Sequence, residues 1–239
     1  MNNIEVCFTP ALFEYTLTEQ PFSVVVIDIL RATTSICTAF QNDVKEIIPV
    51  ATTEEAISYK NKGFLIAAER NGIKLDFADF GNSPDNFSSE LVRGRSIVYS
   101  TTNGTHTIKK ISTGSPVVIA SFINISAAAN FIAKQNKNTV IVCAGWKNKF
   151  NLEDSIFAGA LTERLIKLNF NIMCDSAHAA LDLWTVAKKD VIKYIQKAMH
   201  RERLKKLKLD SILDYCFTED LTDAVPVYDG LKITNATIK

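Results

Sequence analysis

The segment VVVIDILRATTSI, residues 24–36, constrains the fold of this chain more than any other stretch. Its run of apolar, mostly β-branched residues is typical of a buried strand, and the run ends abruptly at Asp28. Arg31 and several hydroxyl residues follow, and then a helical pattern begins. In α/β folds ligands bind at the carboxyl edge of the sheet, where helix N-termini attract anions. The segment therefore predicts an α/β protein with a pocket for an anionic small molecule.

A second segment repeats this design. SIVYSTTNGTHTI, residues 96–108, places hydroxyl groups between an apolar run and a helical pattern. Gly104 lets the backbone turn or approach a ligand closely, and the hydroxyls and helix-start amides can hold a phosphate. The same residue types are also ordinary helix caps. A third polar turn, residues 79–84, ends in Ser83 and Pro84, which equally fit the start of a helix.

Strand-like runs alternate with helical patterns through the first 170 residues. Thr52 and Glu55 fit a capping box that opens a helix reaching about residue 62. Longer helices are predicted over 124–136 and 153–169. This alternation indicates a central sheet covered by helices on both faces. The strand-like runs are 24–29, 46–51, 64–68, 96–100, 116–121 and 139–144.

The pattern changes at about residue 170. Residues 175–216 look almost entirely helical, and short strand-like pieces follow near 225–234. The stretch 188–208 is basic, and we interpret it as a solvated helical face, with a contact surface for an acidic partner as the alternative. No low-complexity linker is visible, so we expect a single domain over residues 1–239, with two lobes around a central cleft as a variant.

The composition excludes several classes of function. The chain has 239 residues and a net charge of +1, so no basic field recruits nucleic acid. No apolar run approaches the roughly 18 residues of a membrane span, and we expect no membrane partner. The five cysteines are widely spaced and include no CxxC pair, which favours reduced thiols in a cytoplasmic protein. A homodimer is the default expectation for an oligomer.

Four acidic residues fall at the predicted carboxyl edge of the sheet. Asp28 and Glu69 end apolar runs, and Glu153 and Asp154 follow the run VIVCAGW and a polar loop. Converging carboxylates without neighbouring histidine or cysteine suit a hard cation such as Mg²⁺. Structural alternatives stay open, because Glu153 and Asp154 fit the first turn of a helix and Glu69 fits an ion pair.

Two arginines follow these acids closely. Guanidinium groups such as those of Arg31 and Arg70 bind phosphate or sulfonate in a bidentate way, unless they pair with the acids beside them. The sequence contains no P-loop, no cysteine-phosphatase loop and no second aspartate for a DxD motif. The three histidines are too scattered along the sequence to indicate a metal cluster.

Five motifs, taken in order, resemble those of the 2-phosphosulfolactate phosphatase (ComB) family. They are IDILRATTSI, AERNG, DFGNSP, STTNGT and EDSIFAG, and the resemblance covers residue 4 to about residue 230. It implies a three-layer α/β/α fold with a mixed central sheet. It also implies a Mg²⁺-dependent phosphatase that converts 2-phospho-3-sulfolactate into 3-sulfolactate and phosphate, a step toward coenzyme M.

The shared motifs contain the candidate site residues, and we assign their roles as a hypothesis. Ala68 and Asn71 stand where the family usually has glycine, which bears on the loop and the exact substrate more than on the chemistry. The attacking group, either water or Asp28, stays open. Catalytic roles are expected for Asp28, Glu69 and Asp154, metal binding for Asp28, Glu69, Glu153 and Asp154, and substrate binding for Arg31, Arg70, Asn82, Ser83, Thr101, Thr102, Asn103 and Gly104.

A function from another class uses the same edge of the sheet. A non-catalytic protein could sense a phosphorylated or dicarboxylate metabolite there. The acids beside the arginines speak against this alternative, because pure anion-binding pockets avoid carboxylates. Hydrolysis of a generic phosphate ester, measured with and without EDTA, separates the two hypotheses.

Overall fold

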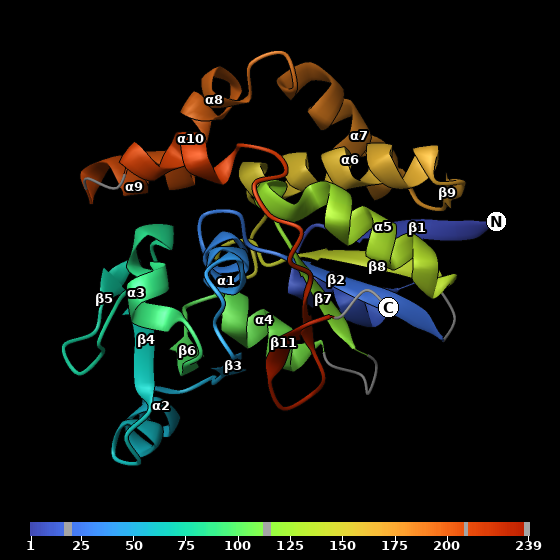
Figure 1. Cartoon of the computed structure of the whole chain (residues 1–239). Helices are drawn as coiled ribbons and strands as arrows, with labels where there is room; N and C mark the ends of the chain where they lie inside the picture. The colour runs from blue at the N-terminus through green and yellow to red at the C-terminus, as the bar shows by residue number, and fades with distance from the viewer. Residues whose placement is uncertain (17–20, 112–115, 208–209, 237–239) are drawn as a thin grey trace.

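We describe the fold from a computed structural model, which covers residues 1–16, 21–111, 116–207 and 210–236 (Figure 1). In these residues eleven strands form one mixed sheet in the order β5-β4-β6-β3-β11-β10-β7-β2-β8-β1-β9. The strands are β1 (Asn2–Cys7), β2 (Phe22–Ile27), β3 (Glu46–Pro49), β4 (Leu65–Arg70), β5 (Ile73–Lys74), β6 (Ser96–Ser100), β7 (Val117–Ala120), β8 (Asn138–Cys143), β9 (Phe170–Ile172), β10 (Pro226–Tyr228) and β11 (Ile233–Asn235).

Helices cover both faces of this sheet, which confirms the three-layer α/β/α arrangement. Short 3₁₀ segments join several of the elements, among them η2 (Pro84–Asn86) and η4 (Ile195–Lys197). The α-helices are α1 (Ala32–Gln41), α2 (Thr53–Lys60), α3 (Ser89–Val92), α4 (Gly104–Lys110), α5 (Ile125–Gln135), α6 (Leu152–Lys167), α7 (Asp175–Ala187), α8 (Val191–Tyr194), α9 (Met199–Lys206) and α10 (Leu213–Cys216).

Strand β2 shows why the core has two layers. All six of its residues are buried, as expected for a parallel strand covered on both faces. Val25 and Ile27 pack into the core that contains residues of α5, α6 and α7. Val24 and Val26 point the other way, into the core that contains residues of α1 and α4. The strand ends at Ile27, so Asp28 is the first residue beyond it.

The C-terminal hairpin joins two parallel halves of the sheet. Strands β3, β4 and β6 pair in parallel on one side, and β7, β2, β8, β1 and β9 do so on the other. Between them β10 pairs antiparallel with β7 and β11 pairs antiparallel with β3. The strand-like pieces expected near 225–234 are therefore strands. They connect the two sets of parallel strands into one sheet.

The predicted strand-like runs correspond to β2, β3, β4, β6, β7 and β8, with ends that differ by at most two residues. Strand β1 and the two edge strands, β5 and β9, were not predicted from the sequence. Residues 175–216 are helical over most of their described length, as expected, but as α7 to α10 with 3₁₀ segments between them. None of the helices in the described ranges combines the length and the apolar character that a membrane crossing requires.

Candidate active site

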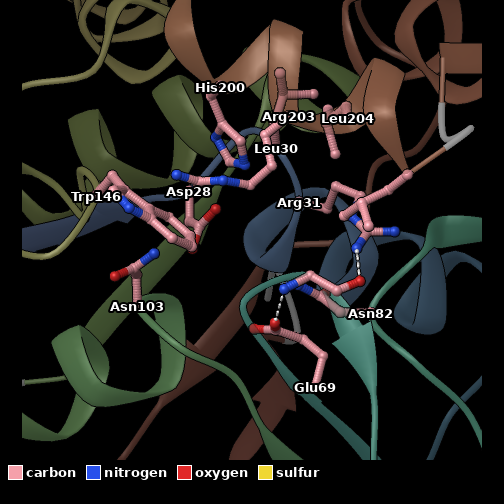
Figure 2. Close-up of a pocket in the computed structure, with 12 residues that line it drawn as sticks. Asp28, Leu30, Arg31, Glu69, Asn82, Asn103, Trp146, His200, Arg203 and Leu204 are labelled. Atoms are coloured by element: carbon pink, nitrogen blue, oxygen red, sulfur yellow. Dashed lines mark hydrogen bonds between the residues drawn. The ribbon is translucent and has the colours of Figure 1, made fainter.

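A small cavity lies where turns after β2, β4, β6 and β8 meet helix α9 (Figure 2). Four strands separate β2 from β6 in the sheet, yet the start of α4 reaches the turn after β2. A Cβ on Gly104 would lie 2.9 Å from Asp28 Oδ2. The cavity holds about 20 Å³ and is lined by Asp28, Leu30, Arg31, Glu69, Gly72, Asn82, Asn103, Trp146, His200, Arg203, Leu204 and Leu207.

Asp28 is buried at the centre of this cavity. Its Oδ1 accepts a hydrogen bond from the backbone N–H of Ala32 at 3.3 Å, whereas Oδ2 makes no hydrogen bond to the described residues. Burial, and to a smaller extent the charges of Glu69 and Glu153, raise the pKa of Asp28 to about 6, and His200 acts against this shift. At neutral pH the carboxylate is therefore largely ionised, with one oxygen available to a cation or a substrate.

Glu69 uses both of its oxygens to hold two turns together. Oε1 accepts from the backbone N–H of Thr102 at 2.7 Å. Oε2 accepts from the N–H of Gly72 at 2.5 Å and from the Thr102 hydroxyl at 3.1 Å. These contacts tie the β4–β5 turn to the β6–α4 turn, so the carboxylate shapes two walls of the cavity.

Asp154 is likewise committed to the backbone. Its two oxygens accept from the N–H groups of Ile29 at 2.9 Å and Gly145 at 3.1 Å. Burial, together with the charges of Asp28 and Glu153, raises its pKa well above the ordinary value. Asp154 therefore braces the turns after β2 and β8 and lies outside the lining of the cavity.

Glu153 is fully buried and holds a histidine. Its Oε1 lies 2.7 Å from Nδ1 of His200, and its Oε2 is buried without a hydrogen-bond partner. The ring of His200 lines the cavity, and its Nε2 makes no hydrogen bond to the described residues. The pair thus presents one free imidazole nitrogen to whatever occupies the cavity.

The structure allows a test of whether these acids fit Mg²⁺. In the described ranges no three His, Cys, Asp or Glu side chains form a group that could hold a metal ion, so the four expected ligands do not meet as one set. Mg²⁺ commonly uses one or two carboxylates and completes its shell with water and substrate phosphate. Asp28 lines the cavity with one oxygen that makes no hydrogen bond to the described residues, and it fits as a carboxylate ligand of such an ion. The free oxygen of Glu153 is buried outside the lining.

The two arginines predicted to bind substrate have different positions. Arg31 is buried, lines the cavity and donates from Nη2 to the carbonyl oxygen of Gly72 at 3.2 Å. Arg70 lies outside the lining and donates to the Glu69 carbonyl at 2.7 Å and to Ser100 Oγ at 2.9 Å. The structure therefore brings Arg31 to the cavity and uses Arg70 to connect β4 and β6.

Some residues of the polar turns line the cavity, and others make hydrogen bonds within the protein. Asn82 and Asn103 line the cavity, and Asn82 accepts a hydrogen bond from the buried Tyr99 hydroxyl. Thr101 caps the start of α4, because its hydroxyl accepts from the N–H of Thr105 at 3.0 Å. Thr102 binds Glu69, as described above.

The remaining position in these turns, Ser83, precedes η2. It lies outside the lining, and its hydroxyl is buried without a partner.

The cavity lining also includes side chains that were not predicted from the sequence. Besides three leucines, they are Trp146, His200 and Arg203. The last two lie in the stretch that we interpreted as a solvated basic face. A signal was present, because His200, Arg203, Leu204 and Leu207 follow the i, i+3, i+4, i+7 spacing of one buried helical stripe. The stripe was not recognised because His200 and Arg203 are polar, whereas a buried stripe is expected to be apolar.

Comparisons with known proteins agree on one family. A family model described as 2-phosphosulpholactate phosphatase matches residues 7–230. A protein of Caldanaerobacter subterraneus subsp. tengcongensis named "Probable 2-phosphosulfolactate phosphatase" is 39% identical over 91% of this chain and 90% of its own length. A protein of the same name from Thermotoga maritima is 40% identical over 84% of this chain and 87% of its own length. Another from Clostridium botulinum is 35% identical over 88% of this chain and 90% of its own length. The chain therefore belongs to the 2-phosphosulfolactate phosphatase family.

Proposed function

We propose that the protein is a Mg²⁺-dependent phosphatase that hydrolyses 2-phospho-3-sulfolactate to 3-sulfolactate and phosphate. The observation that carries this proposal is the cavity lined by Asp28, Arg31 and His200, in which Asp28 keeps a free oxygen and Glu153 holds the His200 ring. The names of the relatives support the substrate. A role toward coenzyme M, a cytoplasmic location and a homodimer remain predictions from the sequence.

The phosphate of the ester needs neutralisation and alignment. Hydrolysis of phosphate monoesters is extremely slow without a catalyst, and charge on the phosphoryl oxygens must be compensated. Arg31 would hold these oxygens, because it is buried within electrostatic reach of Asp28 and has further guanidinium N–H groups beyond the one bound to Gly72. Asp28 would hold the Mg²⁺, whose charge would add to this neutralisation.

The leaving alkoxide needs a proton. His200 is placed to donate it from Nε2, because Glu153 binds Nδ1 and so holds the ring in one orientation. Asp28 would act on the phosphorus side, either as the nucleophile or as the base that positions water. Trapping of a phospho-enzyme at Asp28 during turnover distinguishes these two routes, because only the nucleophilic route forms an aspartyl phosphate.

We expect removal of the metal to separate the enzyme from a non-catalytic sensor. Treatment with EDTA should lower hydrolysis of 2-phospho-3-sulfolactate at least tenfold, and added Mg²⁺ should restore it, because the ion offsets charge in the transition state. Phosphate release is the measurement. Turnover that is unaffected by EDTA would contradict the metal dependence, and tight binding of the ester without turnover in Mg²⁺ would favour the sensor.

We expect the His200→Gln variant to lose about 10²-fold in kcat on 2-phospho-3-sulfolactate, since general acid catalysis contributes 10²–10⁴-fold. The loss on p-nitrophenyl phosphate should be less than about tenfold, because its leaving group departs without a proton. His178→Gln, at an exposed position on α7, is the matched control. Equal losses on both esters would show that His200 is not the acid.

A further inference from the structure

Arg203 is a second cation of the cavity, and no hydrogen-bond acceptor for it is found among the described residues. Its Nη1 is buried and makes no hydrogen bond to the described residues. The ion pairs of α9 in this part of the chain belong to its neighbours, His200 with Glu153 and Arg201 with Asp210. A buried donor without a partner is costly, so this nitrogen is arranged for a group that the protein does not itself supply.

An aromatic ring holds the Arg203 guanidinium in place. Its Cζ lies 3.4 Å from the centroid of the Trp146 ring, a stacked cation–π arrangement. Trp146 is in turn held by reciprocal backbone hydrogen bonds with Lys149, both at 2.9 Å. Because stacking restricts the guanidinium plane, the N–H fork points in a defined direction before any ligand arrives. Such a fork matches the oxygens of a sulfonate or carboxylate.

Arg203 and Arg31 enter the cavity from different elements. Arg31 follows Asp28 in the β2–α1 turn and is anchored to Gly72, whereas Arg203 descends from α9 onto Trp146 (Figure 2). Arg31 shares the β2–α1 turn with Asp28, where the reacting phosphate is expected, whereas Arg203 reaches the cavity from a different part of the chain. We therefore assign the phosphate to Arg31, which leaves Arg203 for another anion.

We propose that Arg203, stacked on Trp146, binds a sulfonate or carboxylate of the substrate and so selects phosphate esters of acidic hydroxy acids over neutral esters. This inference rests on the proposed function and adds a specificity-determining residue to it. It also explains why a basic helix far along the chain covers a cavity that already contains one arginine.

Three esters test the proposal: 2-phospho-3-sulfolactate, 2-phospholactate, which lacks the sulfonate, and isopropyl phosphate, which lacks both acids. We expect Arg203→Gln to lower kcat/KM about 10²-fold on the first ester, the loss typical of a charge-assisted contact, and at least tenfold less on isopropyl phosphate. Arg203→Lys should recover only part, because it keeps the charge without the fork. Lys205→Gln, exposed on the same helix, is the control for charge.

The pattern across the esters identifies the group bound. A loss confined to 2-phospho-3-sulfolactate assigns the sulfonate, and a loss shared with 2-phospholactate assigns the carboxylate. An equal loss on isopropyl phosphate, or no loss on any ester, overturns the proposal.

A binding measurement separates this proposal from the proposed function. Measured by calorimetry, the Arg203→Gln substitution should weaken the binding of 3-sulfolactate about 10²-fold and the binding of inorganic phosphate much less. An equal loss of affinity for both ligands overturns the assignment. If the parent protein hydrolyses none of the three esters, the phosphatase proposal fails, while the calorimetry still decides the role of Arg203.

Discussion

The Asp28→Asn variant is expected to lose at least about 10³-fold of the phosphatase activity and yet to be more stable than the parent protein. The loss follows because the amide cannot act as nucleophile or base, nor compensate a cation. The fold should survive, since the asparagine Oδ1 can still accept from the N–H of Ala32. Phosphate release from 2-phospho-3-sulfolactate measures the activity.

The gain in stability follows from the pKa of Asp28, which burial raises from an ordinary 3.8 to about 6. Near pH 3 Asp28 is protonated in both the folded and the unfolded chain, and no difference arises. Between about pH 4 and pH 6 the carboxyl ionises in the unfolded chain but stays largely protonated in the folded chain, so the parent loses about 3 kcal/mol of stability. Denaturant unfolding in EDTA should therefore give Asp28→Asn the larger free energy of unfolding at pH 8 and give both proteins similar values near pH 3.

A surface change gives the control for both measurements. Asp182→Asn on the exposed side of α7 should alter neither activity nor the dependence of stability on pH. Retained activity in Asp28→Asn would remove Asp28 from the chemistry. A variant that is not stabilised at pH 8 would show that the carboxylate is compensated within the protein.

The second large effect is expected at Gly159, where α6 crosses α7. A Cβ at this position would lie 1.9 Å from the carbonyl oxygen of Ala180 and 2.8 Å from Cβ of Trp184. Backbone atoms cannot move aside as a flexible side chain does, so Gly159→Ala must separate the two helices. We expect a loss of about 3 kcal/mol or more in the free energy of unfolding, despite the better helix propensity of alanine. Thermal unfolding should show a midpoint lower by roughly 10 °C.

Gly63→Ala is the matched comparison for this glycine. No atom lies within 4 Å of a Cβ built at Gly63, so its cost is limited to the strain of a φ of +83°, about 1 kcal/mol. A Gly159→Ala variant that is no less stable than Gly63→Ala would contradict the close approach of α6 and α7.

Several features of the fold follow from short stretches of sequence. The apolar run of β2 predicts a strand buried on both faces, and Asp28 marks its end to within one residue. Thr52 caps α2 as predicted, because its side chain accepts from the N–H of Glu55. These features depend on residues close together in the chain, and so period, turn chemistry and capping are visible without the rest of the protein.

The order of the strands could not be read in this way. The strands β10 and β11 are three residues each, and they pair with β7 and β3 across long sequence separations. Strands of this length carry too little pattern to specify partners, and the antiparallel insertion depends on how two parallel sets are already packed. The sequence accordingly predicts these two strands but not their position in the sheet.

The candidate site likewise has some features that follow from local sequence and others that depend on distant segments. The sequence by itself determined that carboxylates and an arginine lie where buried strands end, at one edge of an α/β sheet. The reason is that an unpaired charge cannot be buried in the core, so a charged residue after an apolar run marks the end of the strand. Only the tertiary structure decided which of them face the cavity. Asp28, Glu69 and Arg31 line it, Asp154 and Arg70 bind backbone groups outside the lining, and His200 and Arg203 reach it from α9. Those choices depend on which donors come within reach across distant segments, and spacing along a chain does not encode that distance.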